Sequence, residues 1–234
     1  MVIISRVLIM VFIGNVNLTE NTTILKLGGF ISINVDVVSN PFCTAMRKTD
    51  SICRHCYAYY MGTRYPRLKQ ALVKNYETLS SRVLTDDEII IIGNYVLTHA
   101  IGLRFNSLGE LINSTHVKNL NLIAMYIKSI DSNFPITIWT KRTELAADIN
   151  RNNIVKIWSN PVINQPQSRV PDGFDGVFNV CDYDYFKQTN TLPNCGGHCA
   201  TCMKCYRVNP EPFVIVELIK RDQTKIKQGK LEEL

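Results

Sequence analysis

Seven of the eight cysteines in this chain of 234 residues stand in two groups whose spacing suits metal ligation. The second group lies in the segment CGGHCATCMKC and consists of Cys195, Cys199, Cys202 and Cys205. Its last three cysteines have the C-x2-C-x2-C spacing of bacterial ferredoxin ligands. Because four thiolates fill the ligand positions of a [4Fe–4S] cluster, this group predicts a structural or electron-relaying centre. A four-cysteine zinc knuckle is the alternative.

The first group is smaller and consists of Cys43, Cys53 and Cys56. Three protein thiolates would leave one iron of a [4Fe–4S] cluster open to a small ligand, as a catalytic zinc keeps one position open. A structural zinc, with His55 or a distant residue as its fourth ligand, is the alternative. Cys181 belongs to neither group and ends a strand-like segment, which predicts a small core residue.

The segments around the cysteines alternate between strand-like and helix-like patterns. Strands are expected over 30–38, 101–106, 136–140, 154–159, 177–181 and 213–218, and helices over 67–83, 85–99, 116–130 and 141–150. A polar loop is expected over 161–171. Such alternation is typical of βαβ units in an α/β protein with a mainly parallel sheet. A complete eightfold barrel takes about 250 residues, so we expect a partial (β/α) barrel.

The cysteine pattern and the elements divide the chain into three parts. They are the partial barrel with the first cysteine group (1–181), a cysteine-rich loop (182–212), and a final strand with a basic tail (213–234). The apolar start, Met1–Ile13, is expected to be a buried strand, with a targeting segment as the alternative. It is too short to span a bilayer, which takes about 20 residues, so no membrane partner is expected. The composition, 46% hydrophobic and 20% charged, excludes a disordered chain.

Polar residues at the ends of the expected strands are candidate ligand contacts. Arg104 and Glu110 flank the end of the strand expected over 101–106, and Asn106 is its last residue. An acidic group at this place could bind an ammonium; an Arg104–Glu110 salt bridge is the alternative. Lys141 and Arg142 follow the next strand and could bind a carboxylate or phosphate. A solvated first helical turn is the alternative for this pair.

Tyr57, Tyr59 and Tyr60 follow the first cysteine group directly. Aromatic side chains beside a metal centre exclude water and thereby tune its potential. We therefore expect these three tyrosines to shield the first group.

Several motifs together resemble a family of phage proteins. The segment Cys53-Arg-His-Cys56-Tyr-Ala resembles the cysteine motif of phage-encoded radical-SAM-like proteins, and the nearest likeness is to the gene product 88 family. The segments RFNSLGE at 104–110, WTKR at 139–142 and CGGHCATCMKCY at 195–206 follow in the family's order. The resemblance covers most of residues 14–218.

The resemblance implies a radical-SAM-type partial barrel with an auxiliary iron–sulfur loop. It implies that the first cysteine group holds a catalytic [4Fe–4S] cluster and the second an auxiliary one. S-adenosylmethionine would bind the open iron, with its amino group near Gly109 and Glu110 and with Asn106 and Arg104 close by. An electron from that cluster would cleave S-adenosylmethionine to a 5′-deoxyadenosyl radical, so an electron donor is a further expected partner.

Three functions are compatible with these features. The first is SAM-dependent radical chemistry on a small molecule. The second is a non-catalytic phage iron–sulfur protein with an electron-transfer or structural role. The third is a zinc-stabilised nucleic-acid-binding module; the net charge of +6 favours anionic partners only mildly, and much of the excess stands after Lys220. Clustered cysteines indicate a reducing compartment, hence the cytoplasm, which is the host's if the protein is phage-encoded.

Overall fold

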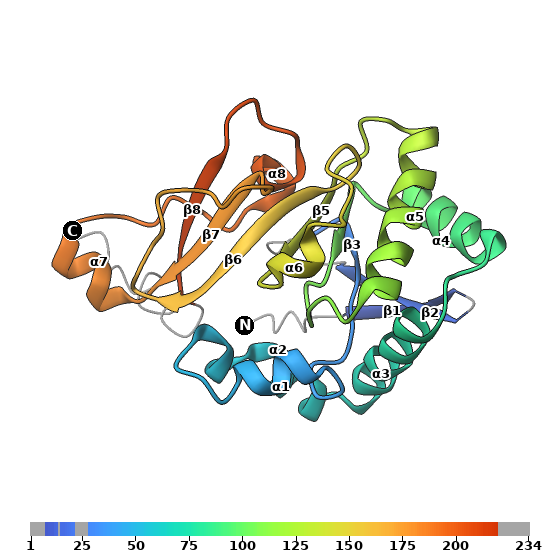
Figure 1. Ribbon diagram of the computed structural model, residues 1–234, viewed down its shortest axis with the longest axis horizontal. Coiled ribbons are helices and arrows are strands. Elements are labelled where there is room, and N and C mark those ends of the chain that lie inside the picture. The colour runs from blue at the N-terminus through green and yellow to red at the C-terminus, as the bar shows by residue number, and fades with distance from the viewer. Residues whose placement is uncertain (1–7, 14, 22–27, 220–234) are drawn as a thin grey trace, which may run out of the picture.

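A computed structural model describes residues 8–13, 15–21 and 28–219. Their strands form one eight-stranded sheet in the order β1-β2-β3-β4-β5-β6-β7-β8. The pairs β1–β2 and β2–β3 are antiparallel, and every pair from β3 to β8 is parallel. Within the described residues β1 and β8 are the two edges, so the sheet is open (Figure 1). The protein is therefore an α/β protein with a mostly parallel sheet, as expected.

The elements have the following bounds. The strands are β1 (Leu8–Ile13), β2 (Val16–Asn21), β3 (Phe30–Ile33), β4 (Gly102–Phe105), β5 (Ile136–Thr140), β6 (Val155–Ile163), β7 (Gly176–Cys181) and β8 (Phe213–Leu218). The helices are α1 (Pro41–Met46), α2 (Tyr57–Arg64), α3 (Pro66–Ser81), α4 (Asp86–His99), α5 (Ser114–Ile130), α6 (Thr143–Ala146), α7 (Tyr183–Thr189) and α8 (Cys199–Cys202). Two short 3₁₀ helices are η1 (Ile52–His55) and η2 (Lys204–Tyr206).

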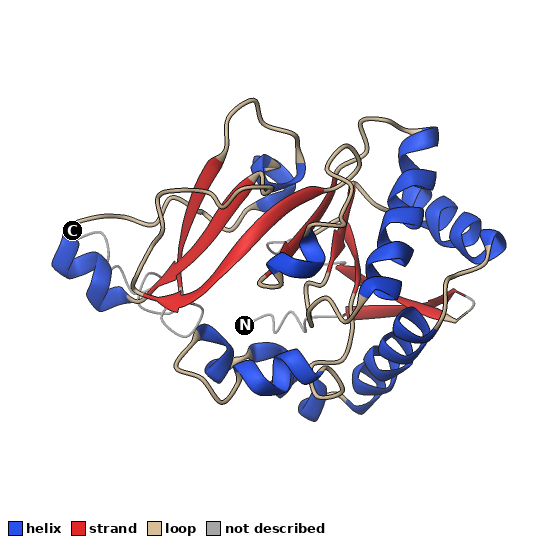
Figure 2. Ribbon diagram, in the orientation of Figure 1, coloured by secondary structure: helices blue, strands red, loops and turns tan. Residues whose placement is uncertain are grey.

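The two faces of the sheet are covered differently. The long helices α3, α4 and α5 gather beside β2–β5 (Figure 2), and their apolar residues form the main core with alternate residues of these strands, such as Leu103 and Phe105. Residues between those, such as Arg104, point to the opposite face. On that face Ile52 of η1 and Cys205 of η2 pack against one apolar cluster of β6, β7 and β8. Both cysteine segments therefore lie on the face that the long helices leave open.

Several expected elements are confirmed. The strands at 136–140 and 213–218 have the expected bounds, and the strands at 101–106 and 177–181 and the helices at 67–83 and 116–130 agree within a few residues. The helix at 86–99 begins with the expected capping box, in which Thr85 and Glu88 each bond the other's backbone N–H. The strand expected at the amino terminus is present over Leu8–Ile13, and residues 1–7 lie outside the described residues.

Three expected boundaries are wrong. The strand expected over 30–38 ends at Ile33, because the next residues bond to another loop. The side-chain oxygen of Asn34 accepts a hydrogen bond from Leu108 N, and Val35 N donates to Leu108 O. The helix expected over 141–150 covers only Thr143–Ala146, and bonds spanning three residues tighten the turn that follows it.

The third wrong boundary is that of β6, which continues to Ile163 through the start of the loop expected over 161–171. The register shifts between Ser159 and Ile163, and such a bulge accommodates Pro161 within a strand. The strand β2, which forms a hairpin with β1, and the helix α7 were not expected from the sequence. The basic tail after Lys220 lies outside the described residues. None of the described helices combines the length and apolar character that crossing a membrane requires.

Candidate metal centres

The first cysteine group follows the carboxyl end of β3, the first parallel strand. Cys43 lies on α1 and Cys53 on η1, and Cys56 caps α2. Asn40, which is fully buried, fixes the start of this segment. Its side chain caps α1 by accepting from Phe42 N at 3.0 Å and donates to the carbonyl of Glu110 at 3.0 Å. The loop after β4 is thereby joined to the cysteine segment.

The three thiols of this group lie close enough for their charges to act on one another. Burial, followed by the charge of Glu110, raises the pKa of the Cys43 thiol well above its usual range. Burial also raises the pKa of Cys53. The thiols of Cys43 and Cys53 therefore stay protonated unless a cation compensates their negative charge, and a metal ion that binds thiols deprotonates them.

Lys141, the first residue after β5, supplies a cation at this place. Its ammonium donates to the hydroxyl of Ser159 at 3.1 Å. Burial by itself would lower the pKa of Lys141, but the negative charges of Cys53 and Glu110 raise it above its ordinary value. Lys141 is thus not the solvated residue of a first helical turn; its ammonium belongs to the surroundings of the first cysteine group.

Glu110 is buried and its carboxylate is already fully engaged. One oxygen accepts from Leu111 N at 2.9 Å and from the hydroxyl of Thr140, and the other accepts from Lys141 N at 2.9 Å. These bonds tie the loop after β4 to the end of β5. An ammonium group that binds Glu110, as expected from the sequence, would have to compete with these three donors.

Gly109 has a backbone requirement of its own. Its φ is +94°, and a Cβ atom at this position would lie 2.4 Å from the carbonyl oxygen of Val35. Only glycine allows the loop after β4 to lie this close to the segment after β3. Gly109 thus positions Glu110 through the backbone.

Asn106 and Arg104 carry buried polar atoms without partners. Asn106 is 4% exposed, and neither atom of its side-chain amide has a hydrogen-bond partner. Arg104 is 7% exposed, and its Nε also lacks a partner. Native proteins rarely leave buried amides unsatisfied, so such a group indicates a bound water, ion or ligand. The alternative of an Arg104–Glu110 salt bridge is wrong: among the described residues the guanidinium of Arg104 lies over the Trp139 ring, and the carboxylate of Glu110 bonds to other residues.

The second cysteine group lies beside β5 and β6, which its 3₁₀ helix η2 contacts. Cys199 begins α8 and packs in one cluster with Phe30, Met203 and Tyr206, and Cys205 of η2 contacts the same cluster. The remaining two members, Cys195 and Cys202, act electrostatically on Cys205 together with Cys199. Burial, followed by the charge of Cys199, raises the pKa of Cys205 to about 12. Cys199 and Cys205 thus share one cluster, and Cys195 and Cys202 lie near enough for their charges to act on Cys205.

Cys181 is separate from both groups. It ends β7, is fully buried and packs against Phe186 and Leu218. The interpretation of Cys181 as a core residue agrees with this position. Cys181 therefore adds no fourth thiol to the first group.

The aromatic residues around the first group have different roles. Tyr59 packs against the same apolar cluster as Cys43 and Cys56, and the guanidinium of Arg47 lies 3.4 Å from the centre of its ring. Tyr57 is 41% exposed and donates from its hydroxyl to Ser107 O at 2.7 Å. Tyr60 is 58% exposed. Of the three tyrosines, Tyr59 has the packing expected of a shielding residue.

Arg142 and the two histidines near the cysteines have no ligand position. Arg142 donates to the carbonyls of Leu111 and Ile112 and pairs with Glu144 at 2.7 Å, so it fixes the loop after β4. His55 and His198 are exposed. Neither is a member of the buried thiol clusters, which leaves the cysteines as the donors in both groups.

The donor chemistry of the two cysteine groups fits a metal centre. All eight cysteines are free thiols. Within the described part of the chain, no set of three or more His, Cys, Asp or Glu side chains has the geometry to hold a metal ion. Soft thiolates are nevertheless the ligands of zinc and iron–sulfur centres, and each group has a cation beside it. Three thiols with Lys141 and four thiols with Arg104 therefore suit anionic metal clusters.

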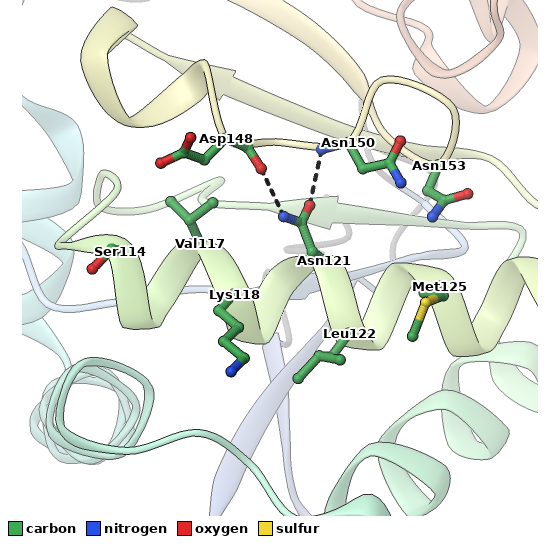
Figure 3. Close-up of a pocket in the computed structure, with 9 residues that line it drawn as sticks. All are labelled: Ser114, Val117, Lys118, Asn121, Leu122, Met125, Asp148, Asn150 and Asn153. Atoms are coloured by element: carbon green, nitrogen blue, oxygen red, sulfur yellow. Dashed lines mark hydrogen bonds between the residues drawn. The ribbon is translucent and has the colours of Figure 1, made fainter.

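A surface hollow of about 340 Å³ lies elsewhere, along the outer side of α5 (Figure 3). Asn121 lines this hollow. Its side chain donates a hydrogen bond to Asp148 O at 2.8 Å and accepts one from Asn150 N at 3.0 Å. These bonds join α5 to the turn after α6. The hollow contains no cysteine and is not part of either centre.

Comparison of the chain with protein-family models, with curated proteins and with solved structures gave no match. The chemistry of both centres therefore follows from the residues of this chain alone.

Proposed function

We propose that this protein is an iron–sulfur protein with two [4Fe–4S] clusters. Cys43, Cys53 and Cys56 hold one cluster, and the four cysteines of the second group hold the other. The observation that carries the proposal is the packing of the thiols, with Cys43 and Cys56 against one apolar cluster and Cys199 and Cys205 in another. The partly buried Lys141 and the buried Arg104 are the cations whose charges interact with these groups. Cations that are removed from water need a compensating negative charge, and cluster-bound thiolates provide it.

The second part of the proposal concerns S-adenosylmethionine. The first group offers three thiolates, and Cys181 packs in a different cluster, so one iron is open to a small ligand. When bound, the cluster would supply the electron that cleaves S-adenosylmethionine. The unpartnered amide of Asn106, at the carboxyl end of β4, supports a polar ligand on this side of the sheet. The fold is accordingly proposed to be a partial barrel of radical-SAM type.

A second candidate is a non-catalytic iron–sulfur protein with the same two clusters. The hydrogen bonding of Glu110 favours it, because Leu111, Thr140 and Lys141 already occupy both carboxylate oxygens. An ammonium ligand would have to share the carboxylate with these three donors. In this case the clusters relay electrons or stabilise the fold.

Electron paramagnetic resonance of the anaerobically purified, reduced protein separates the two candidates. Added S-adenosylmethionine changes the signal of the first cluster if its open iron binds the ligand, and reductant then yields 5′-deoxyadenosine. The Cys53→Ser variant, which lacks a ligand of the first cluster, should show no such change. An unchanged wild-type spectrum at saturating S-adenosylmethionine, with both clusters intact, leaves the non-catalytic function.

A further inference from the structure

Arg104 is a buried cation without a carboxylate. Arg104 lies within β4 and is only 7% exposed. The guanidinium lies 4.0 Å from the centre of the Trp139 ring on the neighbouring strand β5. Among the described residues, Arg104 forms no ion pair with an aspartate or glutamate. The ring of Trp139 offsets only part of the cost of removing this charge from water.

The surroundings of Arg104 on the open face of the sheet belong to the second cysteine group. Phe30, whose partner on β4 is Gly102, packs its ring 4.2 Å from that of Tyr206. Tyr206 directly follows Cys205. Tyr206, Tyr57, Cys199 and Cys205 are the groups whose charges act on Arg104. Trp139, over whose ring the guanidinium lies, packs against the same apolar cluster as Cys195 and Cys205. The guanidinium therefore lies on the face of the sheet that carries the second cysteine group.

Neutral thiols would not compensate a buried guanidinium, whereas a cluster held by four thiolates would. We propose that Arg104 is the counter-charge of the second cluster and raises its reduction potential. This inference rests on the proposed function, because it requires a redox-active cluster in the second cysteine group. It assigns to Arg104 a role different from contact with S-adenosylmethionine.

The sign of the effect follows from charge. Reduction by a one-electron donor such as dithionite adds one electron to the cluster, so the reduced form is more negative by one charge. A fixed cation nearby stabilises the reduced form more than the oxidised form, and the interaction is strong where water is excluded. Removal of the cation therefore shifts the potential to more negative values.

Three variants test this role. Arg104→Met removes the charge and keeps an unbranched side chain, and Arg104→Lys keeps the charge. Arg207→Met is the matched control, because Arg207 is exposed and lies two residues after Cys205. Salt and water screen its charge. Each protein is titrated with dithionite under anaerobic conditions and followed by electron paramagnetic resonance. The signal of the second cluster is identified as the one that is missing from the Cys202→Ser variant.

We expect Arg104→Met to reduce the ratio of reduced to oxidised cluster at a fixed potential by about tenfold, a shift of about 59 mV for one electron. Arg104→Lys and Arg207→Met should stay within about threefold of wild type, a change of about 28 mV on the same scale. An iron-loaded Arg104→Met protein with the wild-type potential would overturn the inference.

If Arg104→Met loses the second cluster, its potential cannot be measured, and Arg104→Lys becomes the deciding variant. An Arg104→Lys protein that retains the second cluster near the wild-type potential supports the role of the charge. An Arg104→Lys protein that also loses the cluster overturns that role. A wild-type protein without iron would instead overturn the proposed function itself. Measurement of wild-type iron therefore separates the two failures.

Discussion

The backbone N–H of Lys141 donates a hydrogen bond of 2.9 Å to the carboxylate of Glu110. This bond joins the ends of the two neighbouring parallel strands β4 and β5 beside the first cysteine group. The ammonium of the same lysine is subject to the charges of the thiols and of Glu110. One residue therefore fixes the loop through its backbone and supplies a cation through its side chain.

Glu110→Gln should lower the free energy of unfolding by about 1–3 kcal/mol, because it leaves a buried donor unpaired. Glutamine would place an NH₂ group against one of the three donors that now point at the carboxylate. Glu144→Gln is the control, since Glu144 is exposed and its ion pair is with Arg142; its change should stay within about 0.5 kcal/mol. Anaerobic denaturant unfolding measures both, and equal effects of the two substitutions would contradict the role of Glu110.

Cys202→Ser should cost stability only if Cys202 binds metal. Its side chain is exposed, so the substitution removes no packing from the metal-free fold. Metal-binding free energy contributes to folding free energy where the fold assembles the site. We therefore expect Cys202→Ser to lose about half of the bound iron and to melt at a lower temperature.

Cys181→Ser is the matched control for that substitution. Cys181 is fully buried among Phe186 and Leu218, so a hydroxyl at this position lowers stability but leaves the iron content unchanged. Iron loss from Cys181→Ser, or full iron retention by Cys202→Ser, would contradict the division into three and four ligands.

Gly109→Ala should be more destabilising than Gly173→Ala. Both glycines have positive φ, +94° and +84°, so both substitutions carry backbone strain of about 1–3 kcal/mol. Only the Cβ at position 109 also meets a backbone carbonyl at 2.4 Å, whereas none lies within 4 Å at position 173. Thermal unfolding of the two variants compares them, and a Gly109→Ala protein as stable as Gly173→Ala would show that the loop after β4 can move away.

His116 should make stability depend on pH. Its side chain is fully buried in the first turn of α5 and accepts a hydrogen bond from Ile112 N at 3.2 Å. Burial lowers the pKa of His116 from 6.5 to about 3. As the pH falls, the unfolded chain binds this proton before the folded chain does. The contribution of neutral His116 to the free energy of unfolding is therefore complete above pH 6.5 and is lost as the pH falls from 6.5 toward 3.

The expected slope is about 1.4 kcal/mol per pH unit below pH 6.5. His116→Gln keeps an acceptor for Ile112 but does not titrate, so its unfolding free energy should fall less steeply in this range. Identical pH profiles for wild type and His116→Gln would show that His116 gains its proton without unfolding.

The sequence predicted the elements whose pattern is local. The alternation ITIWT at 136–140 and the capping box at Thr85 specify their elements without reference to the rest of the chain. The strand after Phe30 was predicted too long, because its end depends on hydrogen bonds to Leu108, which lies more than 70 residues away. The hairpin of β1 and β2 was missed because Val16–Asn21 carries several polar residues.

The cysteine groups were predictable from spacing, but the cations beside them were not. Lys141 and Arg104 stood out in the sequence as charged residues near strand ends. Their pairing with different cysteine groups depends on strand order and on side-chain alternation along β4. Neither property can be read from one residue's neighbours in the sequence.

The most direct test of the account is the metal content of the protein purified without oxygen. Two [4Fe–4S] clusters predict a brown protein with about eight iron and eight acid-labile sulfide ions per chain. A colourless protein with stoichiometric zinc and no sulfide would contradict the account.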